Sequence, residues 1–136
     1  MPQINFEILG RKLVNKYPTI AKELIEYPKI YDLKLLPQIK ETILTHPRLS
    51  NKTATEKKEY FVAVALILYD PDHLAGYKKI RTGLRREIST LFNCSPTLIS
   101  NLSKKVTILL SIYKFFKADV NYFADMISKE FANVNE

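Results

Sequence analysis

Apolar side chains recur at steps of three and four residues along most of this chain, and that period constrains the fold more than any other feature. Phe6, Leu9, Leu13 and Tyr17 follow it, and so do the apolar positions of residues 97–117. Steps of this length place side chains on one face of an α-helix, whereas a half-buried strand alternates every second residue. The sequence therefore predicts an all-α protein of about six or seven helices.

Prolines divide the first fifty residues into short segments. Residues 18–28 and 37–47 each run from proline to proline, and their apolar positions match: Ile20, Leu24 and Ile25 in the first, Ile39, Ile43 and Leu44 in the second. Proline is accepted in the first turn of a helix because the N–H that it lacks has no intrahelical partner there. We expect two short helices that form a hairpin packed on the rest of the chain.

Residues 48–55 are polar and lack the helical period. Such a segment favours a boundary, so we expect an N-terminal helical subdomain over residues 1–50 and a helical domain over residues 51–136. Thr53 followed by Glu56 has the form of a capping box, which predicts the start of a helix.

The apolar run from Phe61 to Tyr69 follows that cap. It is far shorter than the ~20 residues that span a bilayer, so it predicts a helix buried on most sides. The segment Asp70-Pro71-Asp72 is expected to end this helix. Two carboxylates could also hold a metal ion or exchange protons, but a helix stop explains them without a further assumption.

Basic residues outnumber acidic ones by 21 to 14, and the net charge is +7. An excess of this size favours a polyanionic partner. Most of it falls in residues 78–105, where Glu87 is the one acidic side chain. The basic side chains of this window are Lys78, Lys79, Arg81, Arg85, Arg86, Lys104 and Lys105. A solvated basic face with no ligand is the alternative interpretation.

Residues 85–104 have the pattern of two short helices that cross steeply around a tight turn. The inward positions are apolar: Ile88 and Phe92 in the first helix, Cys94 in the turn, and Ile99 and Leu102 in the second helix. The turn itself is Asn93-Cys94-Ser95-Pro96. Asn93 tolerates a left-handed conformation better than other residues that carry a side chain. Ser95 suits the N-cap of the second helix, and Pro96 suits its first position.

This segment resembles the helix-turn-helix of phage repressors, Cro-like proteins and many bacterial transcription regulators. The resemblance covers about twenty of the 136 residues. Ser89 stands where the family usually has alanine, and Asn93 stands where it usually has glycine. The resemblance implies a protein of phage or bacterial type that binds double-stranded DNA sequence-specifically and regulates transcription.

The same resemblance assigns roles to residues. It makes residues 95–105 the helix that enters the major groove. Candidates for contacts with base edges are Ser95, Thr97, Ser100 and Asn101, of which Asn101 suits a bidentate pair with adenine. Candidates for contacts with phosphates are Arg81, Arg85, Arg86, Lys104 and Lys105, and the track extends through Lys78 and Lys79.

The second helix carries one apolar stripe from Ile99 through Val106 to Tyr113 and Phe116, about five turns of helix. Something must cover that stripe. The N-terminal hairpin or the last helix, with Val120, Phe123, Met126, Ile127 and Phe131, can do so within one chain. A second copy of the protein is the alternative, and we therefore keep a homodimer or higher homo-oligomer open.

Other chemistries have little support in the sequence. His46 and His73 have no ligand partners at zinc-site spacing, and Cys94 sits at an apolar turn position without a basic activator. We expect no enzymatic activity, no cofactor, no metal and no membrane partner. One cysteine and no signal-peptide pattern favour the reducing, cytoplasmic interior of a bacterial or host cell.

A second class of function remains open beside DNA binding. Long amphipathic helices are also typical of helical assembly or adaptor proteins and of phage packaging or structural proteins, whose contact with nucleic acid is at most non-specific. In such a protein, the N-terminal helices would be the surface that binds a protein partner.

Overall fold

The computed structural model describes residues 29–74 and 79–131. Every regular element in these residues is a helix, which confirms the all-α prediction. The α-helices are α3 (Leu36–Leu44), α4 (Ala54–Tyr69), α5 (Pro71–Leu74), α6 (Thr82–Leu91), α7 (Pro96–Ile112) and α8 (Lys114–Glu130), with 3-10 helices η1 (Leu33–Leu35) and η2 (Pro47–Leu49). The helices expected over residues 6–17 and 18–28 lie outside the described residues, as does Lys78.

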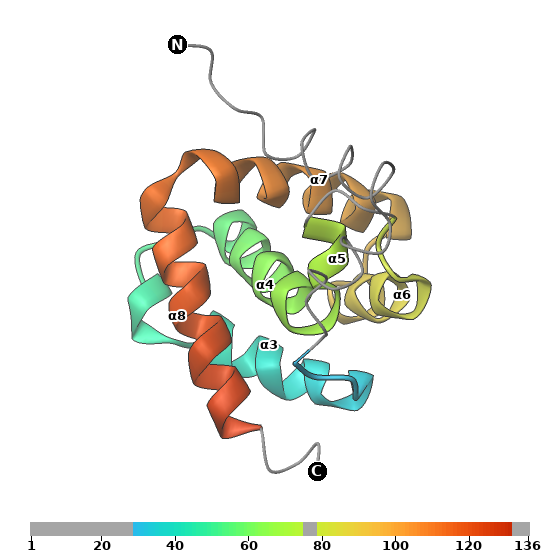
Figure 1. The fold of residues 1–136 in the computed structure, drawn as a ribbon, viewed down its shortest axis with the longest axis horizontal. Helices are drawn as coiled ribbons and strands as arrows, with labels where there is room; N and C mark the ends of the chain where they lie inside the picture. The colour runs from blue at the N-terminus through green and yellow to red at the C-terminus, as the bar shows by residue number, and fades with distance from the viewer. Residues whose placement is uncertain (1–28, 75–78, 132–136) are drawn as a thin grey trace, which may run out of the picture.

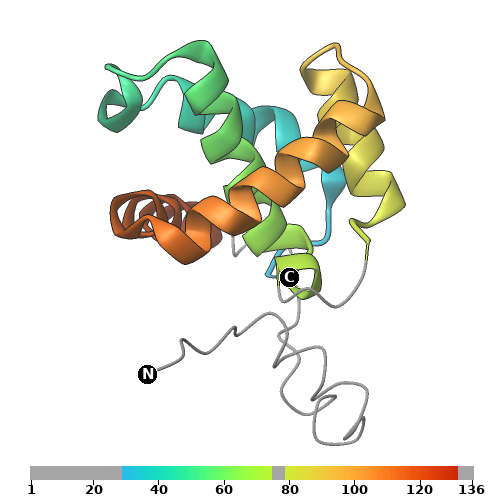
Figure 2. The same ribbon diagram turned by 90° about the horizontal axis from the view of Figure 1, so that it is seen from above.

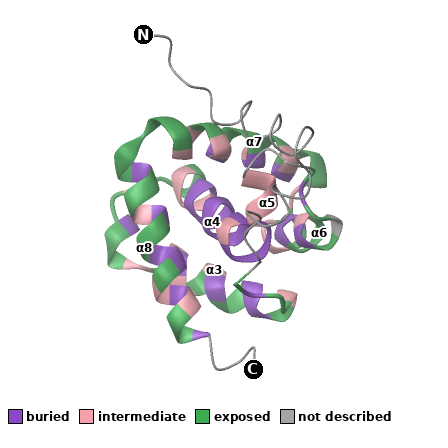
Figure 3. Ribbon diagram, in the orientation of Figure 1, coloured by how far each residue is buried: buried purple, intermediate pink, exposed green. Residues whose placement is uncertain are grey.

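Helix α4 lies at the centre of these helices, with α7, α8, α3 and α6 around it (Figure 1). Every side chain from Tyr60 to Tyr69 is buried except Ile67, which is half-buried. The prediction that residues 61–69 form a helix buried on most sides is thus confirmed. Exposed positions gather on the outer sides of the surrounding helices, while α4 is largely buried (Figure 3).

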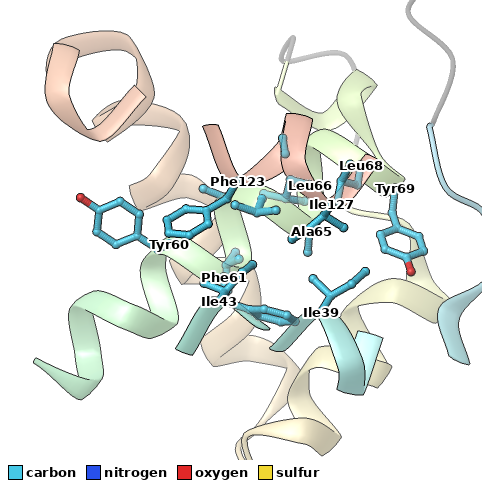
Figure 4. Packing of buried hydrophobic residues seen from close by; sticks show 14 of the residues in the cluster. Ile39, Ile43, Tyr60, Phe61, Ala65, Leu66, Leu68, Tyr69, Phe123 and Ile127 are labelled. Atoms are coloured by element: carbon cyan, nitrogen blue, oxygen red, sulfur yellow. The ribbon is translucent and has the colours of Figure 1, made fainter. Parts of the chain in front are cut away.

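The core forms where α3, α7 and α8 pack on α4, and Figure 4 shows its part between α3, α4 and α8. Ile39 and Ile43 of α3, together with Phe123 and Ile127 of α8, are fully buried beside the side chains of α4. Helix α3 has proline in its first turn and buries the apolar face predicted for residues 37–47. Residues on both sides of segment 48–55 therefore contribute to one core, and the expected boundary near residue 50 stays a prediction.

The ends of α4 follow from its flanking polar residues. The Glu56 backbone N–H donates to the Thr53 hydroxyl over 3.1 Å, and the Thr53 N–H donates to the Glu56 carboxylate over 3.3 Å. This confirms the predicted capping box. The helix ends at Tyr69, and the buried Asp70 carboxylate accepts the Arg81 backbone N–H over 2.9 Å. Asp70 therefore connects the end of α4 to the start of α6.

Two tyrosines of α4 anchor the polar edges of the core. The Tyr69 hydroxyl donates to the Asp32 carbonyl over 2.7 Å, and burial raises the pKa of Tyr69 well above its ordinary value. The Tyr60 hydroxyl donates to the Asp119 carboxylate over 3.3 Å. Burial, followed by that carboxylate, raises the pKa of Tyr60 to about 12. Asp119 also pairs with Arg48 over 3.1 Å, so η2, α4 and α8 are joined at one point.

The predicted single helical pattern over residues 97–117 is wrong at its end. Helix α7 ends at Ile112, Tyr113 is extended, and α8 begins at Lys114. A straight continuation would carry Phe116 and the residues after it away from α4. The turn at Tyr113 instead lets Phe116, Val120 and Phe123 become buried. Tertiary packing therefore overrides a period that continues through the break.

We predict that Thr53→Ala lowers the free energy of unfolding by about 1 kcal/mol, because it removes the oxygen that caps the first turn of α4. Thr55→Ala is the matched control, since Thr55 is exposed in the same turn and lies inside the helix. Alanine has the higher helix propensity, so this control should lose no stability. Urea denaturation measures both variants, and equal losses would contradict the capping role.

Candidate nucleic-acid interface

The connection between α6 and α7 is a tight turn that passes through a left-handed residue. Asn93 has φ 50° and is the one non-glycine residue with positive φ in the described chain. The Asn93 N–H donates to the Thr90 carbonyl over 3.2 Å, and the Cys94 N–H donates to the Ser89 carbonyl over 3.0 Å. These two bonds form a Schellman motif, which gives hydrogen bonds to carbonyls that the end of a helix otherwise leaves unpaired. The predicted left-handed Asn93 is confirmed.

The start of α7 also follows its sequence. Ser95 is the N-cap, and its hydroxyl accepts the Leu98 N–H over 3.2 Å. Pro96 occupies the first turn, where its missing N–H has no cost. The direction in which α7 leaves the turn is thus set by residues adjacent to it in sequence.

The inner faces of α6 and α7 pack as the spacing predicts. Ile88 and Ile99 are fully buried, while Phe92, Cys94 and Leu102 are half-buried against the core. The two helices cross steeply at one side of the molecule (Figure 2). Helix α6 begins at Thr82, earlier than the predicted Arg85. This extra turn buries Leu84, which the sequence analysis missed.

The outward face of the N-terminal half of α7 is polar. Ser95, Thr97, Asn101 and Lys104 are exposed, as expected for the candidates on this face. Ser100 differs, because it is half-buried and its hydroxyl accepts a hydrogen bond from the Arg85 guanidinium over 3.1 Å. That bond joins α6 to α7 at the edge of the polar face, so Arg85 and Ser100 are held together.

The basic candidates fall into two groups. Lys79, Arg81, Arg86 and Lys104 are exposed. Lys105 is exposed as well, but its ammonium pairs with the Glu59 carboxylate over 3.1 Å, and the Glu59 side chain is 9% exposed. A buried carboxylate needs such a partner, because an unpaired charge in the interior is costly. Lys105 therefore has a structural role that the sequence pattern did not reveal.

Two further lysines lie beside the turn, and the sequence analysis did not identify them. The Lys40 ammonium donates to the Leu91 carbonyl over 2.9 Å and lies 4.7 Å from the centroid of the Phe92 ring. The Lys58 ammonium lies 5.2 Å from the same centroid. Both come from outside residues 78–105, and only the packing of α3 and α4 places them here. No pattern in the sequence marks them.

A second surface lies at the other end of α7, where it meets α8. Ile108, Ile112, Tyr113 and Phe115 are exposed, and the exposed fraction of Phe115 reaches 88%. We call these four residues the α7–α8 corner. The predicted apolar stripe of α7 is covered mainly by α4, with α6 and α8 on either side. The cover ends before Tyr113, because this residue of the predicted stripe is exposed at the corner.

No group of three His, Cys, Asp or Glu side chains in the described residues is placed to hold a metal ion. No helix in this part of the chain has the length and apolarity needed to cross a bilayer. Cys94 is half-buried in the turn. The His46 Nδ1 accepts the Arg48 N–H over 3.0 Å, and its ring packs edge-on against Phe123.

Comparison of the chain with protein-family models, with curated protein sequences and with solved structures finds no match.

The turn gives a stability prediction. Asn93→Gly should keep or raise the free energy of unfolding, because glycine adopts positive φ without steric cost. Asn93→Ala should lower it by about 1 kcal/mol, because alanine lacks the short polar side chain through which asparagine can hydrogen-bond locally in the left-handed conformation. Denaturant melts compare the two variants. An alanine variant as stable as the glycine variant would contradict the left-handed geometry.

Proposed function

We propose that this protein binds double-stranded DNA sequence-specifically, with α6, the turn and α7 acting as a helix-turn-helix, and that it regulates transcription. The observation that carries the proposal is the Asn93 turn. It holds α7 across α6 with the polar face of its first turns exposed and with basic side chains beside it. A helix presented in this way can enter the major groove with its N-terminal residues against the base edges.

Each candidate on α7 then has a defined part. Asn101 is exposed at the middle of the polar face, and its amide can donate to and accept from adenine in one bidentate pair. Thr97 lies one turn earlier and offers a hydroxyl to a base edge. The Ser95 hydroxyl already caps α7, and the Ser100 hydroxyl already accepts a hydrogen bond from Arg85. A contact between either hydroxyl and a base would be made in addition to these bonds.

Contacts with the phosphate backbone belong to the exposed cations. Arg86 on α6 and Lys104 on α7 are exposed, and so are Lys79 and Arg81 just before α6. Such contacts fix orientation and raise affinity for every duplex alike. Lys105 is left out of this set, because its charge balances Glu59.

The test is selection of bound duplexes from a random pool at physiological salt, followed by variants measured on the enriched duplex and on an unrelated one. Asn101→Ala should lower affinity for the enriched duplex by about tenfold, since a bidentate base pair contributes ~1–3 kcal/mol of discrimination. Its affinity for the unrelated duplex should not change. Asn121→Ala, at an exposed asparagine of α8, is the matched control.

Arg86→Ala should lower the affinity for both duplexes by a similar factor, because a phosphate contact carries no sequence information. If Asn101→Ala lowered the affinity for both duplexes equally, this would contradict a contact between Asn101 and a base. Binding without any enriched motif would contradict sequence specificity.

A second candidate function has one observation in its favour. The α7–α8 corner exposes four large apolar side chains together, and such patches mark surfaces that bind other macromolecules. An assembly or adaptor protein would use that corner and would need no duplex. Absence of binding to every duplex would favour this function over the first.

A further inference from the structure

Phe92 brings together two cations that are distant in sequence. Lys40 lies on α3 and Lys58 on α4, yet both ammonium groups are within 5.2 Å of the centroid of the same ring. Phe61 supports that ring edge-on, with the two centroids 5.3 Å apart. The ring is therefore a fixed platform, and the face of an aromatic ring attracts a cation.

The positive charge gathered here is not neutralised within the described residues. Neither lysine forms an ion pair with a carboxylate there. The Lys40 ammonium donates to the Leu91 carbonyl, and the Lys58 ammonium lies 5.2 Å from the centroid of the Phe92 ring. The two ammonium groups lie within about one Debye length of each other, so they repel across a short distance. A nearby anion would relieve that repulsion, and it would be attracted by both charges at once.

The position of the pair matches the proposed DNA contact. Phe92 is the last residue before the turn, and Ser95 begins α7 only three residues later. The lysines therefore lie near the end of α7 that would enter the groove. A duplex with α7 in its major groove has a phosphate backbone on each side of that groove.

We propose that Lys40 and Lys58 bind the phosphate backbone of DNA beside the N-terminal end of α7, with Phe92 positioning both ammonium groups. This inference rests on the proposed function and adds a contact from outside the helix-turn-helix. It assigns α3 and α4, which otherwise form the core, a direct part in binding.

Salt dependence of binding to a random-sequence duplex tests the proposal. Each phosphate contact contributes about 0.9 to the slope of log K against log salt concentration. The double variant Lys40→Gln with Lys58→Gln should therefore lower the magnitude of that slope by about 2. The matched control is Lys117→Gln with Lys129→Gln, which removes the same charge from exposed positions of α8. It should leave the slope unchanged.

Single variants separate binding from folding. Lys58 makes no hydrogen bond to the backbone, so Lys58→Gln tests its contact even if loss of the Lys40 bond to Leu91 destabilises the turn. Lys58→Gln should lower the magnitude of the slope by about one. Lys58→Arg, which keeps the charge, should give the slope of the unaltered protein. Phe92→Leu keeps every charge but removes the aromatic ring that both ammonium groups contact. It should therefore lower the affinity for the duplex.

The outcomes are distinguishable. Equal slopes for the two double variants, with the unaltered protein binding the duplex, would overturn this inference and leave the proposed function standing. A protein that binds no duplex at any salt concentration would overturn both.

Discussion

Burial of α4 on almost every side is the constraint on which the rest of the structure depends. A helix that is apolar all round cannot lie at a surface, so other helices must cover it. Helices α3, α7 and α8 each do so with one face, and α6 packs on α7 and α3. The opposite face of α7 is left to solvent as a consequence. The position of the candidate interface thus follows from the core.

The face of α7 that remains exposed changes character along its length. Its first half carries Thr97, Asn101 and Lys104, and its last turns carry Ile108 and Ile112. The polar half lies next to a turn whose geometry is fixed by hydrogen bonds, while the apolar half leads to the α7–α8 corner. A rigid, polar and basic end suits contact with a duplex. The apolar end suits contact with another protein.

Local chemistry made much of this fold predictable from the sequence. The capping box at Thr53, the left-handed Asn93 and the N-cap Ser95 each depend on neighbours within a few residues. The break at Tyr113 was not predictable, because the apolar period continues through it. The pairing of Lys105 with Glu59 and the approach of Lys58 to Phe92 depend on how helices pack, and no spacing in the sequence records that.

The most direct test of the account is a map of the amide resonances that shift when a short duplex is added to the isotopically labelled protein. We expect the largest shifts in the first three turns of α7, in the turn before it, and near Lys40 and Lys58. Shifts confined to the α7–α8 corner, or no shifts at all, would contradict it.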